Sequence, residues 1–91
     1  MSGKAFLKYL PRIFQNVFQV IAVPPKTWPA YLEKGDYSGI YTMEAKELMK
    51  AIDGYKAGQK DVDAVAKEVR HTGAALIQLY AHLLHQLDGN K

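Results

Sequence analysis

The stretch from residue 61 to 87 constrains the fold most, because its pattern is typical of one long amphipathic helix. It contains no proline, and its apolar residues recur at the three- and four-residue spacing that brings side chains to one helix face. These residues are Val62, Val65, Val69, Leu76, Leu79, Tyr80, Leu83, Leu84 and Leu87. A helix with so wide an apolar face has to pack against other elements. We therefore expect this face to form the core of an all-α fold.

A second amphipathic helix is predicted for residues 5–23. On a helical wheel its polar residues fall within one arc, and its valine, isoleucine and phenylalanine residues occupy the other side. Pro11 lies inside this pattern, and proline is favoured only in the first turn of a helix, so we expect a break near Leu10. Pro24 and Pro25 should end the helix, because neither can donate a backbone hydrogen bond.

A short helix is expected near residues 28–34. Thr27 can cap its start, Pro29 suits its first turn, and Gly35 can adopt the left-handed conformation that ends helices. The segment 35–41, GDYSGIY, combines two glycines with turn-forming residues, and we expect a loop there.

The last element, residues 42–57, should be a helix that Thr42 caps and Gly58 ends. The sequence therefore predicts an all-α fold, a small helical bundle of three main helices and one short helix. The main helices are expected at about 5–23, 42–57 and 61–87, and the short one near 28–34.

Length and composition indicate one domain spanning residues 1–91. A chain of 91 residues with 48% apolar residues can form one core, but two domains of half this size would bury too little surface. The chain has no cysteine, which excludes disulfides and thiolate metal sites. No apolar stretch is long enough for a transmembrane helix, and no signal-peptide pattern opens the chain. We expect a cytoplasmic protein, with peripheral membrane contact as the alternative.

The side of the C-terminal helix opposite its apolar face is uncharged. From residue 71 to 87 the sequence contains no Lys, Arg, Asp or Glu, whereas a solvated helix face is usually charged. Small residues on this side would allow another helix to approach closely. The candidate partner interface consists of His71, Ala74, Ala75, Gln78, Ala81, His82 and His85. We therefore expect a non-enzymatic interaction or assembly module that binds itself or a larger protein.

The N-terminal helix offers a second candidate surface. Residues 1–32 contain four basic residues and no acidic one, although the net charge of the whole chain is only +3. Basic residues beside exposed aromatic rings are typical of helices that lie on anionic membranes. This surface consists of Lys8, Arg12, Phe14, Phe18, Trp28 and Tyr31. Membrane-surface docking is the first alternative to a protein partner, and packing within the bundle explains the same pattern.

Residues 65–80 resemble the helix-turn-helix of TetR-type repressors, which makes DNA binding a second alternative. Ala66 matches the small packing position of that element, and Leu76 and Leu79 match later core positions. The match fails at Arg70, where a turn glycine is usual, and at His71, where an apolar residue is usual. We therefore expect one continuous helix here and rank nucleic acid below the other partners.

No catalytic, cofactor or metal site is predicted. The serines lack a nucleophile motif, and no glycine-rich phosphate loop follows a strand. Only His82 and His85 are close enough in sequence to share a metal ion, because His71 lies about 16 Å away along the helix axis. Two histidines at a solvent or protein interface explain this pair without a metal.

Overall fold

The computed structural model describes residues 2–89, and its elements are all helical. In chain order they are α1 (Gly3–Phe6), the 3₁₀ helix η1 (Leu7–Tyr9), α2 (Leu10–Ala22), α3 (Pro29–Glu33), α4 (Tyr37–Lys56) and α5 (Val62–Gly89). The described part of the chain contains no strand. The predicted all-α class, with three main helices and a short one, is confirmed.

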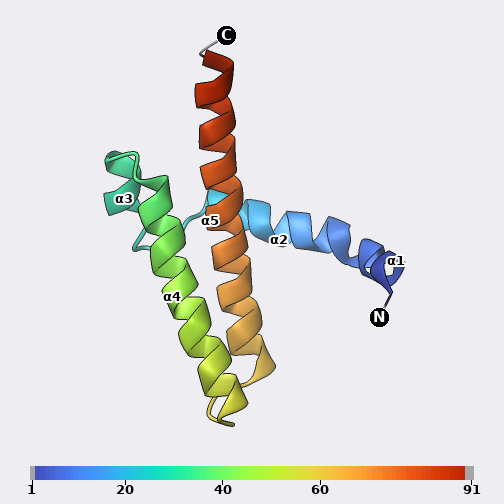
Figure 1. Ribbon diagram of the computed structural model, residues 1–91. Helices are drawn as coiled ribbons and strands as arrows, with labels where there is room; N and C mark the ends of the chain where they lie inside the picture. Colours follow the sequence, from blue (N-terminus) through green and yellow to red (C-terminus); the bar gives the residue numbers. More distant parts are fainter. Residues whose placement is uncertain (1, 90–91) are drawn as a thin grey trace.

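The main body is an antiparallel hairpin of α4 and α5 (Figure 1). α2 crosses α5 near its middle and extends away from the hairpin, while α3 lies beside the start of α4. The arrangement is open: the Cα radius of gyration is 14.9 Å, whereas a compact domain of this length has about 12 Å. Large parts of α2 and of the C-terminal half of α5 therefore lack a covering neighbour.

Local chemistry accounts for most of the helix ends. The N-terminal helix breaks just before Pro11, so α2 begins at Leu10 with this proline in its first turn. α2 ends at Ala22, ahead of Pro24 and Pro25. Gly35 and Gly58 have φ values of 66° and 74°, left-handed conformations that follow the ends of α3 and α4. At the start of α5, the Asp61 carboxylate accepts a hydrogen bond from the Ala64 amide at 3.0 Å.

The expectation of a loop at residues 35–41 is wrong, because α4 already begins at Tyr37. Asp36 caps it by accepting a hydrogen bond from the Gly39 amide at 2.9 Å. Thr42 therefore lies inside the helix, where its hydroxyl donates to the carbonyl of Ser38 instead of capping. Thr27 does not cap α3 either, since Trp28 occupies the N-cap position without a side-chain hydrogen bond.

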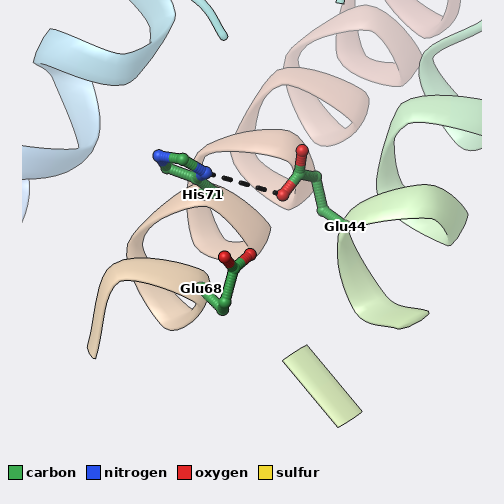
Figure 2. A group of neighbouring side chains, drawn as sticks. All are labelled: Glu44, Glu68 and His71. Atoms are coloured by element: carbon green, nitrogen blue, oxygen red, sulfur yellow. Dashed lines mark ion pairs between the residues drawn. The ribbon is translucent and has the colours of Figure 1, made fainter. Parts of the chain in front are cut away.

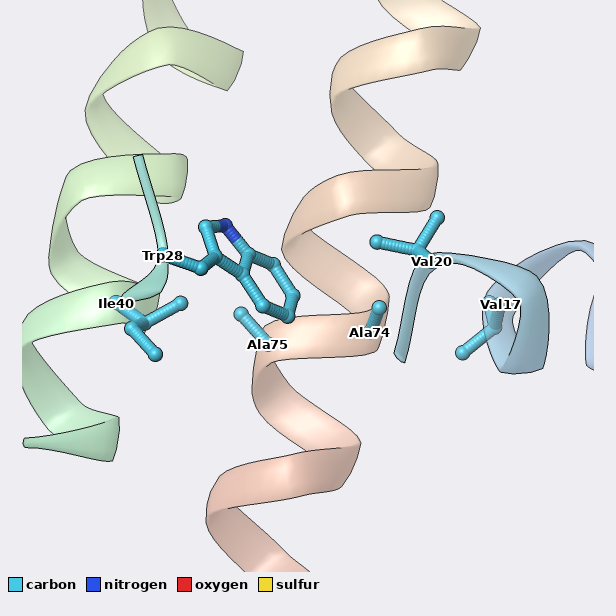
Figure 3. Close-up of a cluster of buried hydrophobic side chains, with 6 residues drawn as sticks. All are labelled: Val17, Val20, Trp28, Ile40, Ala74 and Ala75. Carbon is cyan, nitrogen blue, oxygen red and sulfur yellow. The ribbon is translucent and has the colours of Figure 1, made fainter. Parts of the chain in front are cut away.

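The core lies where α2, α4 and α5 meet around one indole ring (Figure 3). Trp28 is fully buried, and Figure 3 shows its ring beside the small residue Ala75 of α5, while Ala74 lies beside Val20 of α2. The core cluster consists of Val17, Val20, Trp28, Ile40, Ala74 and Ala75. The bulky Trp28 ring fits against the small residues on this face of α5, which explains why this face, rather than the leucine-rich face, is buried.

The expectation that the apolar face of α5 forms the core is therefore wrong for seven of its nine residues, and the other two, Val65 and Leu79, are half-buried. Leu76 is 51% exposed, Tyr80 62% and Leu87 60%. Val62, Val69, Leu83 and Leu84 are exposed as well. The helical periodicity was correctly assigned, but α4 and α2 cover the small-residue side and its flanks.

Candidate functional site

The face predicted as a partner interface is largely covered by the chain itself. Ala74 and Ala75 are buried in the core, so these two positions are not available to a partner in this structure. Gln78 is half-buried. His82 stacks near Tyr37 of α4, with ring centroids 4.5 Å apart. The close helix contact inferred from small residues exists, but the neighbouring helices that make it belong to the same chain.

Ala81 and His85 remain exposed on the distal part of that face. They lie toward the C-terminal end of α5, which projects past the start of α4 (Figure 1). Part of the predicted interface therefore makes contacts within the chain, and only its distal part is exposed.

The second predicted surface is also only partly exposed. Phe14 and Phe18 of α2 are 46% and 57% exposed, and their rings stack with centroids 6.1 Å apart. Lys8 and Arg12 are exposed nearby. Trp28 does not belong to this surface, because it fills the core; Tyr31, also assigned to it, packs half-buried against the same cluster.

A long apolar seam on α5 was missed as a site because the sequence pattern assigned it to the core. Its residues repeat with alternating spacings of three and four, which is the heptad pattern of a coiled-coil helix. The seam consists of Val62, Ala66, Val69, Gly73, Leu76, Tyr80, Leu83 and Leu87. All of them except Gly73 are exposed, and Gly73 faces Val17 of α2. The periodicity was visible in the sequence, but its exposure was not.

A groove between α2 and the N-terminal half of α5 adjoins this surface. Its volume is about 840 Å³, and the seam residues Val62, Val69 and Gly73 line one side of it. Tyr9 and Ile13 line the opposite side, from η1 and α2. The groove and the seam together form a largely apolar surface that runs along α5.

A polar cluster lies between α4 and α5, beside the core (Figure 2). Glu44 of α4 is only 4% exposed, and its Oε1 accepts a hydrogen bond of 3.0 Å from the indole N–H of Trp28. Its other oxygen, Oε2, lies 3.7 Å from Nδ1 of His71. The hydroxyl of Thr72 donates to the backbone carbonyl of Glu44 at 3.1 Å.

Glu68 completes the polar cluster from one turn earlier on α5. One ligand atom from each of Glu44, Glu68 and His71 lies within 4.8 Å of the others, close enough to hold a metal ion together. The expectation that no Glu-x-x-His motif accompanies the histidines is wrong. Glu68 and His71 have Glu-x-x-His spacing, which places both side chains on one helix face.

The helix-turn-helix interpretation fails on geometry. α5 is unbroken from Val62 to Gly89, so no turn divides residues 65–80 into two helices. None of the helices in the described part of the chain is long and apolar enough to span a membrane.

The chain was compared with models of protein families, with curated proteins and with solved structures, and it matches none of them.

Proposed function

We propose that this protein is a non-enzymatic helical interaction module that binds a helix of another protein chain along the α5 seam. The observation that carries the proposal is the exposure of heptad-spaced apolar residues on both sides of Gly73, the position where α2 covers α5. The longest uncovered run consists of Leu76, Tyr80, Leu83 and Leu87. Isolated exposed apolar residues are ordinary, but a contiguous stripe of them is typical of a protein-binding surface. The proposed location is the cytoplasm.

A second copy of the chain is the simplest partner, since a heptad seam can pack against its own copy around a twofold axis. The positions that flank the seam favour such a pair. They include Ile77 and Leu84, which are themselves exposed, and carry only Asp63 and Arg70 as charged residues. Like-charge repulsion between two seams is therefore small. Each half-exposed leucine that becomes buried would contribute roughly 1 kcal/mol.

Light scattering coupled to size-exclusion chromatography tests this proposal. We expect the wild-type chain to have about twice the mass of the 10.2 kDa monomer, and the variant Leu76→Glu/Leu83→Glu to be monomeric with an unchanged far-UV circular dichroism spectrum. The matched control is Met49→Glu/Tyr55→Glu. It makes the same chemical change at α4 residues that are 57% and 52% exposed but lie outside the seam.

The control should remain a dimer. A wild type that stays monomeric at all concentrations would reject self-association through the seam. If that monomer instead sediments with anionic liposomes in a salt-dependent manner, the exposed Phe14–Phe18 pair and the basic residues of α2 would replace the seam as the binding surface.

A further inference from the structure

Three metal-ligating side chains converge where α4 packs against α5 (Figure 2). Glu44 comes from α4, and Glu68 and His71 come from consecutive turns of α5. We propose that these residues bind one divalent transition-metal ion of the Zn²⁺ class. This site is distinct from the α5 seam, and it is independent of the proposed function.

The spacing of the Glu44 and His71 atoms fits a shared ion better than a direct hydrogen bond, and a carboxylate oxygen of Glu68 lies within 4.8 Å of both. The 3.7 Å between Oε2 of Glu44 and Nδ1 of His71 exceeds the usual length of a hydrogen bond. Two ligand atoms that each lie about 2.1 Å from a tetrahedral zinc ion are about 3.4 Å apart. A shift of a few tenths of an ångström would therefore bring both atoms into coordination.

The charge of the cluster also favours a cation. Two carboxylates face one imidazole, and within residues 2–89 neither Glu44 nor Glu68 forms an ion pair with a lysine or arginine. Glu68 has no side-chain hydrogen bond in that range either. A carboxylate as deeply buried as that of Glu44 is costly unless a positive charge or hydrogen bonds compensate it. A bound divalent ion would neutralise both carboxylates at once.

The surroundings hold the Glu44 carboxylate in the orientation that an ion needs. The Trp28 indole N–H occupies Oε1 and leaves Oε2 directed at His71. The Thr72 hydroxyl, bonded to the Glu44 carbonyl, ties the two helices together at this level. Such contacts behind the ligands orient them and strengthen metal binding.

The donor set selects the class of ion. One imidazole nitrogen and two carboxylate oxygens suit zinc and neighbouring transition metals, whereas Ca²⁺ and Mg²⁺ prefer oxygen ligands alone. Three protein ligands leave at least one coordination position for water. Glu68 and His71 are partly exposed, so an ion can reach the site from solvent.

Calorimetric titration of the EDTA-stripped full chain with Zn²⁺ tests the proposal. We expect one ion per chain, and we expect Glu68→Gln to weaken binding by at least about tenfold without changing the circular dichroism spectrum. Glu47→Gln is the matched control, because Glu47 is an exposed carboxylate on α4 that lies outside the cluster and forms an ion pair with Lys50. His85→Gln is a second control for the other pair of histidines. Both controls should bind Zn²⁺ as the wild type does.

Trp28 provides a local readout, since it is the only tryptophan in the chain and is hydrogen-bonded to a proposed ligand. Saturating Co²⁺ should quench its fluorescence in the wild type and not in Glu68→Gln at the same concentration. Absence of saturable binding would overturn the site and leave only the direct contact between Glu44 and His71. Binding that survives Glu68→Gln but is lost in His85→Gln would also overturn it.

Discussion

At the scale of single residues, the buried pair of Trp28 and Glu44 joins the apolar core to the polar cluster. The indole fills the space between α4 and α5, and its N–H satisfies a carboxylate that is almost completely buried. A carboxylate in this position would be unfavourable without that donor, because burial removes its contacts with water. The same hydrogen bond therefore serves the core and the polar cluster beside it.

Replacing Trp28 with phenylalanine should lower the free energy of unfolding by at least about 1–3 kcal/mol, because the Glu44 oxygen loses its donor and the smaller phenyl ring leaves a space in the core. Urea denaturation followed by circular dichroism, with EDTA present, measures the change. Tyr55→Phe, at a residue that is 52% exposed, should change stability by less than about 0.5 kcal/mol.

The cost of Trp28→Phe should be smaller in a Glu44→Leu background, where no carboxylate is left without a partner. Equal costs in both backgrounds would show that the indole stabilises the fold through packing alone.

At the scale of secondary-structure elements, the start of α4 illustrates how a cap can extend a helix into a segment rich in turn residues. Gly35 and Gly39 favour a loop when the sequence is considered alone. The Asp36 carboxylate nevertheless accepts from the Gly39 amide, and it occupies the space where a β-carbon at position 39 would lie. Glycine is therefore needed at position 39 because of the cap, although glycine inside a helix is usually unfavourable.

We expect Gly39→Ala to destabilise the protein by about 0.5–2 kcal/mol, the usual value of an N-cap, because the added methyl group displaces the Asp36 carboxylate. In an Asp36→Ala background, where no cap remains to be lost, the same substitution should be neutral or stabilising, since alanine favours helices more than glycine. Chemical denaturation of the four proteins measures both effects. A destabilisation of equal size in the two backgrounds would contradict the proposed role of the cap.

At the scale of the whole molecule, the chain combines a small core with much exposed apolar surface. Among residues 2–89, only two large side chains, Trp28 and Ile40, are fully buried, and the radius of gyration exceeds that of a compact domain. A core of this size supports marginal stability. Contact with a second chain along the α5 seam would bury additional apolar surface and stabilise the fold.

This coupling predicts that the melting temperature of the wild type rises with protein concentration, because a dimer that forms only from folded chains stabilises them by mass action. Thermal melts over a hundredfold range of concentration measure the effect. The Leu76→Glu/Leu83→Glu variant should melt at one temperature throughout. If the wild-type melting temperature does not depend on concentration, self-association does not stabilise the fold.

The sequence by itself determined the class of fold and most helix ends. Proline at positions 11 and 24 and glycine at positions 35 and 58 act through their own backbone conformations, so local chemistry suffices to place them. The periodicity of residues 61–87 likewise identifies one long helix with two distinct faces. None of these inferences requires knowing which helices pack against one another.

Only the tertiary structure decided which face of α5 is buried. Periodicity groups residues onto a face, but the face that becomes core depends on which neighbour reaches it and on how the side chains fit. Here Trp28 belongs to one core cluster with Ala74 and Ala75, which leaves Leu76, Leu83, Leu84 and Leu87 exposed. The polar cluster was hidden for the same reason, because Glu44 lies 24 residues before Glu68 in the sequence and meets it only when α4 folds back along α5.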